Sequence, residues 1–110
     1  MTGLYEVTLT HAAAQDLEEL YDYIAIHDAP LKADQVLHRI EAAVTSLSKL
    51  PERGSFTKEL SAIGIREYRE IYFKPYRIIY RMQKPNVYVY LIVDGRRDMQ
   101  ALLQRRLLRA

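Results

Sequence analysis

The chain has 110 residues, 49% of them hydrophobic, a net charge of +2, and no cysteine. This length and composition predict a single domain over residues 1–110 and argue against disorder. The lack of cysteine excludes disulfides and thiolate chemistry, while the absence of a long apolar run or signal-like start predicts a soluble, cytoplasmic protein.

The first 50 residues predict a strand and two helices. Tyr5 to Thr10 alternates between apolar and polar residues, as a half-buried strand does. The hydroxyl of Thr10 is suited to cap a helix that starts at His11, and Pro30 suits the first turn of a second helix. Apolar residues then recur at helical spacing in both segments, at 17, 20, 21 and 24 and at 37, 40, 44 and 47. The two helices are expected to form a hairpin.

Residues 51–64 (PERGSFTKELSAIG) have the composition of a loop, and the apolar period then changes from helical to two. Ile65–Phe73, Tyr76–Met82 and Asn86–Val93 are predicted strands, and their short connections favour antiparallel pairing. Asp98 can cap a terminal helix that carries Met99, Leu102, Leu103 and Leu107. The predicted fold is α+β, in the order β-α-α-β-β-β-α, with helices on one face of a sheet.

The charge is unevenly distributed along the chain. Residues 65–110 contain eleven basic and four acidic residues, a net charge of +7, whereas residues 1–64 have a net charge of −5. Arg77 and Arg81 share one face of a predicted strand. Guanidinium groups on a rigid sheet suit an anionic partner, either an acidic protein or nucleic acid. The competing interpretation is that these arginines form salt bridges with Glu67, Glu70, Asp94 and Asp98.

Other motifs give little support for small-molecule chemistry. The three histidines, His11, His27 and His38, lack the spacing of metal ligands, and the glycines form no phosphate-binding loop. We expect no cofactor and no metal. The acidic face of the first helix, which includes Asp16 and Glu19, is best explained as a solvated surface.

The order of elements, together with PYRIIYRM (75–82), VYVYLIVDGRRD (87–98) and a leucine-rich tail, resembles the RelE/ParE superfamily of bacterial toxins from type II toxin–antitoxin systems. The resemblance is strongest over GIREYREIYFKPYRIIYR (64–81) and covers nearly the whole chain. It implies an antitoxin partner, a hetero-oligomeric complex, and roles in plasmid stabilisation and growth arrest.

Within this superfamily, RelE-type members are ribosome-dependent endoribonucleases that cut mRNA without a metal. By similarity, Arg77 and Arg97 match the arginines that stabilise the transition state. The paired lysines of that type are replaced by Tyr68, Arg69, Glu70 and Ile71, and from Met99 onward there is no Tyr, His, Glu or Asp. The usual proton-transfer groups are therefore missing.

ParE-type members share the fold but inhibit DNA gyrase and block replication. The long helical hairpin and the PERG loop (51–54) are closer to this type, so the sequence favours a gyrase-binding toxin without catalytic residues. Its candidate contacts to the target or antitoxin are eight arginines: Arg66, Arg69, Arg77, Arg81, Arg96, Arg97, Arg105 and Arg106. The alternatives are a RelE-like ribonuclease and a domain that is retained in an antitoxin-bound assembly without an active target.

Overall fold

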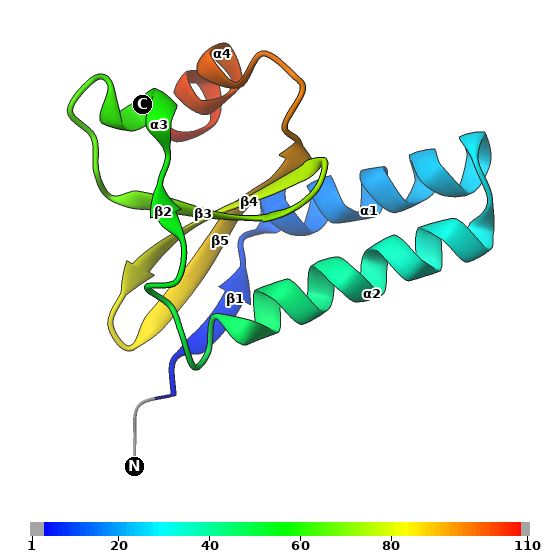
Figure 1. The fold of residues 1–110 in the computed structure, drawn as a ribbon, viewed down its shortest axis with the longest axis horizontal. Helices are drawn as coiled ribbons and strands as arrows, with labels where there is room; N and C mark the ends of the chain where they lie inside the picture. The colour runs from blue at the N-terminus through cyan, green and yellow to red at the C-terminus, as the bar shows by residue number, and fades with distance from the viewer. Residues whose placement is uncertain (1–3, 109–110) are drawn as a thin grey trace.

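The computed structural model describes residues 4–108 and confirms the predicted α+β fold. Its elements are β1 (Glu6–Leu9), α1 (His11–His27), α2 (Pro30–Ser46), β2 (Ser55–Phe56), α3 (Lys58–Ser61), β3 (Tyr68–Phe73), β4 (Tyr76–Gln83), β5 (Asn86–Asp94), α4 (Met99–Leu103) and a π-helical turn η1 (Gln104–Leu108) (Figure 1). The sequence analysis missed β2 and α3, which lie in the predicted loop, and placed the start of β3 three residues too early, at Ile65.

The helical hairpin forms as the sequence predicted. The Thr10 hydroxyl accepts a hydrogen bond from the N–H of Ala13 at 3.1 Å, and Pro30 occupies the first turn of α2. Ile24 of α1 and Val36 and Ile40 of α2 are buried in one apolar cluster with the sheet. Burial of this stripe supplies most of the stability of such helices, because an isolated helix of this length is marginal in water.

The five strands form one sheet in the order β1-β5-β4-β3-β2. The β3–β4–β5 meander is antiparallel, as predicted, while β1 runs parallel to β5 and pairs only with Asn86–Val89. In Figure 1 the hairpin of α1 and α2 extends to one side beyond the sheet, and α3 and α4 lie side by side above the sheet, where α4 follows the end of β5.

Helices cover both faces of the sheet, which corrects the prediction that they would lie on one. The hairpin packs on Ile78, Tyr80 and Ile92, whereas α3 and α4 pack on the opposite face, where Ile79 and Leu91 are buried. A register shift in the β4–β5 pairing places Leu91 opposite Ile79 but Val89 opposite Tyr80, so Tyr90 is the extra residue of a β-bulge. Simple alternation therefore fails at this point of β5.

The PERG loop is fastened to β4 by Tyr80. The buried Tyr80 hydroxyl donates to the carbonyl of Pro51 at 2.6 Å and accepts from the N–H of Gly54 at 3.0 Å, and burial raises the pKa of this hydroxyl. A Cβ at Gly54 would lie 2.5 Å from the carbonyl oxygen of Glu70, so only glycine fits here. This loop leads the chain across the sheet edge and delivers α3 to the second face.

None of the helices within residues 4–108 is both long and apolar enough to span a membrane.

Candidate partner-binding surface

Arg77 lies inside the fold, between β4 and α3. Its guanidinium donates from NH1 and NH2 to the two carboxylate oxygens of Glu59, at 2.9 and 2.8 Å, and from Nε to Glu70 at 2.8 Å. NH2 also bonds to Glu70, whose second oxygen accepts from the Tyr72 hydroxyl at 2.9 Å. The Arg77 residue is only 5% exposed. We call Arg77, Glu59 and Glu70 the buried ion cluster.

The two carboxylates hold Arg77 in its charged form. Hydrogen bonds with Glu59 and Glu70 raise the pKa of Arg77, and the hydrogen bond with Arg77 lowers the pKa of Glu59. A buried guanidinium with two carboxylates has its donors and its charge satisfied internally. In this structure the guanidinium of Arg77, one of the contact residues that the sequence suggested, is bound inside the fold and joins α3 to β3 and β4.

Arg106 also binds within the chain. Its NH1 and NH2 donate to the two carboxylate oxygens of Asp16, each at 3.1 Å, and NH2 also donates to the carbonyl of Tyr90 at 3.1 Å. The second oxygen of Asp16 accepts the N–H of Ile92 at 3.2 Å. Asp16 is therefore largely buried and paired, which corrects the expectation of a solvated acidic face, and the guanidinium of Arg106 is paired within the chain in this structure.

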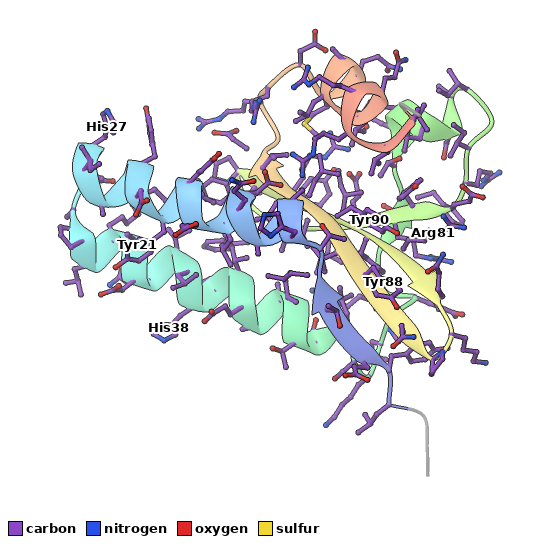
Figure 2. The ribbon with its side chains drawn as sticks, turned by 180° about the vertical axis from the view of Figure 1, so that it is seen from behind. Tyr21, His27, His38, Arg81, Tyr88 and Tyr90 are labelled. Carbon is purple, nitrogen blue, oxygen red and sulfur yellow. The ribbon has the colours of Figure 1, made fainter. Side chains whose placement is uncertain are left out.

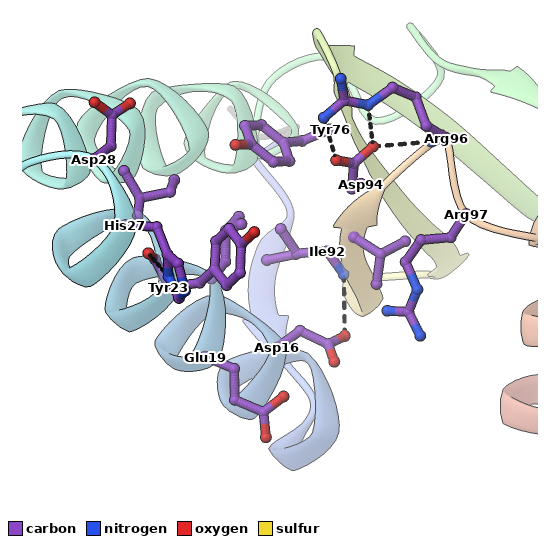
Figure 3. Close-up of a pocket in the computed structure, with 13 residues that line it drawn as sticks. Asp16, Glu19, Tyr23, His27, Asp28, Tyr76, Ile92, Asp94, Arg96 and Arg97 are labelled. Carbon is purple, nitrogen blue, oxygen red and sulfur yellow. Dashed lines mark hydrogen bonds and ion pairs between the residues drawn. The ribbon is translucent and has the colours of Figure 1, made fainter.

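Arg96 and Arg97 follow β5 and differ in their surroundings. The exposed guanidinium of Arg96 donates to the carboxylate of Asp94 from Nε at 2.9 Å and from NH2 at 2.6 Å, which lowers the pKa of Asp94. Arg97 is exposed, and none of the ion pairs among residues 4–108 includes it. In Figure 3 the Arg97 side chain borders a cleft between α1 and the end of β5.

Arg66 and Arg69 gather around Phe56 of β2. Their guanidinium carbons lie 5.3 and 4.3 Å from the centre of the Phe56 ring, within the range of cation–π attraction. Arg69 also donates to the carbonyl of Gly54 at 2.8 Å, so it helps to hold the PERG loop. Arg66 is exposed, and so is Arg105 of η1.

The half of the second sheet face around Arg81, which we call the open half, is partly exposed: Arg81, Tyr88 and Tyr90 are partly exposed there, whereas Tyr68 is buried. Arg81 lies there with its guanidinium 5.8 Å from the ring centre of Tyr68 and 3.9 Å from the carboxylate of Glu67. Tyr90 packs edge-on against Tyr68 at 5.6 Å, and Figure 2 shows Arg81, Tyr88 and Tyr90 together over β4 and β5. Aromatic rings beside a guanidinium form a surface suited to contact with another macromolecule.

The four acids that the sequence offered as salt-bridge partners have divided roles. Glu70, Asp94 and Glu67 do pair with Arg77, Arg96 and Arg81, respectively, whereas Asp98 caps α4 by accepting the N–H of Ala101 at 3.2 Å. The sequence analysis missed Glu59 because it lies in the predicted loop. The one available signal was the pattern Thr57-Lys-Glu-Leu, since an acid in the first turn after a threonine is typical of a helix start.

No group of three or more metal-ligating side chains occurs in the part of the chain that the structure describes. The chemistry of the surface is that of exposed guanidinium and phenol groups, which bind and orient anions.

Comparisons with known proteins show which proteins this chain resembles. Residues 7–99 match the model of the ParE toxin of the type II toxin–antitoxin system parDE. Toxin ParE3 of Caulobacter vibrioides is 27% identical over 100 residues, which cover 91% of this chain and 96% of that protein.

Two solved structures share the fold. The chromosomal ParDE toxin–antitoxin system of P. aeruginosa superposes with a TM-score of 0.70 at 19% identity, covering 84% of this chain and 98% of that one. The RelBE2 toxin–antitoxin complex of Mycobacterium tuberculosis gives a TM-score of 0.61 at 19% identity, covering 83% and 98%. Because the family model matches residues 7–99, which are most of the chain, this chain belongs to the ParE toxin family of type II toxin–antitoxin systems.

Proposed function

We propose that this ParE-family toxin inhibits DNA gyrase in the cytoplasm, blocks replication and arrests growth until a cognate antitoxin neutralises it. The observation that carries the choice of target is the buried ion cluster. A ribonuclease of the RelE type would use Arg77 and Arg97 together on the scissile phosphate, and here Arg77 is bound by Glu59 and Glu70. A guanidinium that already holds two carboxylates is a poor ligand for a phosphate.

The missing proton-transfer groups support the same choice. Cleavage of RNA by its own 2′-hydroxyl needs a base and an acid near the phosphate. From Met99 to Leu108 the described C-terminal segment has no Tyr, His, Glu or Asp, and Glu70 of β3 is used in the ion cluster. Function then rests on binding through the exposed side chains, with no bond broken by this chain.

An acidic antitoxin fits the charge of the C-terminal half. Residues 65–110 have a net charge of +7, and within residues 4–108 no carboxylate lies within ion-pair distance of Arg66, Arg97 or Arg105. Such exposed charges mainly raise the association rate and set the register of a partner, while apolar contacts supply affinity. We propose these three arginines and Arg81 as contacts to the antitoxin or the target.

The decisive experiment runs two assays side by side on the purified toxin. We expect it to inhibit DNA supercoiling by gyrase and to trap cleaved DNA, and we expect mRNA on programmed ribosomes to remain intact. Adding the antitoxin encoded beside the toxin should restore supercoiling. Cleaved mRNA with unaffected gyrase would overturn the proposal in favour of a ribonuclease, and inactivity in both assays would favour a domain without an active target.

A further inference from the structure

Along part of one edge, β5 has no neighbouring strand among residues 4–108. β1 pairs with β5 only from Asn86 to Val89, but β5 continues to Asp94. Beyond Val89 the backbone groups that point away from β4 have no strand partner on that side within the described part of the chain. An exposed edge of this kind is a template on which another chain can add a strand.

In the free toxin two side chains occupy this edge. The Asp16 carboxylate accepts the N–H of Ile92 at 3.2 Å, and Arg106 donates to the carbonyl of Tyr90 at 3.1 Å. The same two side chains bind each other through two hydrogen bonds of 3.1 Å. A carboxylate thus stands in for the carbonyl of a neighbouring strand, and a guanidinium stands in for its N–H. We call Asp16 and Arg106 the edge cap.

A cleft of about 650 Å³ lies beside the edge cap. Its lining includes Leu20, Tyr23 and Ile24 of α1 and Tyr76 of β4. Tyr23 is 62% exposed, and its ring stacks on that of His27 with the ring centres 4.1 Å apart. In Figure 3, Tyr23 and Tyr76 lie on one side of Ile92 and Arg97 lies on the other.

These two sides favour one kind of occupant. Successive side chains of a strand point to opposite faces, so an added strand would direct alternate residues toward the tyrosines and toward Arg97. Glu19 and Asp28 also line the wall formed by α1 and would repel acidic side chains there. The segment that fits is extended, with apolar residues facing α1 alternating with acidic residues that face Arg97 and Arg106.

We propose that the β5 edge from Tyr90 to Asp94 is the binding site for an extended, alternating acidic and apolar segment of the antitoxin, which enters by opening the edge cap. This inference rests on the antitoxin partnership proposed above. An acidic side chain of the segment takes the place of Asp16 on Arg106, a second one binds Arg97, and the backbone of the segment replaces the cap on Ile92 and Tyr90. The ion pair of Arg106 is exchanged rather than lost, so the new bond to Arg97, the added strand pairing and the filled cleft supply the net affinity.

The first test compares two charge reversals at opposite ends of β5. Arg97→Glu places a carboxylate where the segment's acid binds, and we expect affinity for the cognate antitoxin to fall at least about tenfold. Lys84→Glu makes the same change in charge in the exposed turn before β5, so it is the matched control and should alter affinity less than about threefold. Equal effects of the two variants would overturn the proposal.

The second test asks whether substitutions in the edge cap strengthen or weaken the binding of the antitoxin. Asp16→Asn keeps an acceptor for the Ile92 N–H but weakens the hold on Arg106, so opening costs less and the antitoxin should bind more tightly. Arg106→Met removes the guanidinium that the segment's acid would bind, so the antitoxin should bind less tightly. If both variants weaken binding equally, the cap stays closed in the complex and the displacement is refuted. Thermal unfolding checks the fold of each variant, and Arg97→Glu decides the edge even if Arg106→Met fails to fold.

The two proposals fail in different ways. If the wild-type toxin does not bind its antitoxin at all, the partnership itself is wrong. If it does bind, hydrogen exchange of the Ile92 amide tests the β5 site, measured on the Asp16→Asn variant alone and on the complex of that variant with the antitoxin. Equal exchange rates in the two samples would mean that the antitoxin binds elsewhere, and only the β5 site would be refuted.

Discussion

The two halves of the second sheet face differ in how their arginines are paired and how far they are exposed. Arg77 and Arg81 lie on the same face of β4, yet Arg77 is buried under α3 with two carboxylates, whereas Arg81 is partly exposed beside Tyr68. Ile79 between them is fully buried. The comparison shows that the number of guanidinium groups on a strand does not measure the positive surface. Whether a guanidinium adds to the positive surface depends on whether another element places a carboxylate beside it.

For Arg77 that element is α3. Glu59 comes from a helix of only four residues, whose position depends on the fastening of the PERG loop by Tyr80. In the open half, the one ion pair that Arg81 forms among residues 4–108 is with Glu67, which lies outside the helices and whose side chain is 59% exposed. Ion pairs in water are worth little, whereas breaking a buried cluster is costly. The predictions below test this difference, from the largest effect to the smallest.

The largest effect is expected for Arg77→Met. The change leaves Glu59 and Glu70 close together without a cation, and a buried charge that has lost its partner costs about 3–5 kcal/mol. Urea unfolding of the purified variant measures the loss. The triple variant Arg77→Met, Glu59→Leu, Glu70→Leu should recover much of it, because an apolar cluster of similar size replaces the ionic one.

If Arg77→Met unfolds at the same urea concentration as the wild type, the ion cluster is not a structural element, and Arg77 returns to the candidates for contact. Loss of growth arrest in this variant, taken without the unfolding measurement, would not distinguish a contact from a fold.

Gly95→Ala should have the next largest effect on the covered half. A Cβ at position 95 would lie 2.7 Å from Cδ and 2.9 Å from Cγ of Arg77, whose guanidinium cannot move away from its two carboxylates. Overpacking of this kind costs about 1–3 kcal/mol. Unfolding in urea measures it, and Gly64→Ala is an unsuitable comparison because Gly64 has a φ of 84°, which itself favours glycine. A stability unchanged by Gly95→Ala would mean that the Arg77 stem is free to shift.

Acid should destabilise the covered half through Glu59. Because the bond with Arg77 lowers the pKa of Glu59 in the folded state, its contribution to stability is complete above the unfolded pKa, about 4.3, and is lost as the pH falls through the folded value. The free energy of unfolding should therefore fall less steeply below about pH 5 in Glu59→Gln than in the wild type. The same slope in Glu59→Gln and in the wild type would show that this ion pair does not contribute to the acid sensitivity of the fold.

The sequence predicted the elements whose apolar residues recur with a regular period. The hairpin, the meander and the terminal helix all have apolar patterns of 3.6 or 2 residues, and so has the face that Arg77 and Arg81 share. The elements it missed are too short to show a period: β2 has two residues and α3 has four. The bulge at Tyr90 was missed because an extra residue changes the phase without changing the composition.

The candidate site was harder to predict than the fold, because its decisive contacts join residues far apart in the chain. Asp16 and Arg106 are separated by 90 residues, and each alone resembles an ordinary surface charge. Arg97 could be identified as a candidate because it follows the last strand. It forms no ion pair among residues 4–108, however, because Asp94 pairs with the neighbouring Arg96. Which of two neighbouring arginines an acid binds is set by packing and cannot be derived from charge counts.

The smallest effect on stability is expected in the open half. Arg81→Ala removes a guanidinium that is 3.9 Å from an exposed carboxylate and 5.8 Å from the ring centre of Tyr68, and each such contact is worth less than about 1 kcal/mol at a solvated site. The urea midpoint should therefore stay close to the wild-type value. A loss as large as that of Arg77→Met would show that the open half is as structural as the covered half. With the fold intact, any loss of gyrase inhibition or antitoxin affinity in Arg81→Ala reports directly on contact through this face, a distinction that no substitution at Arg77 can provide.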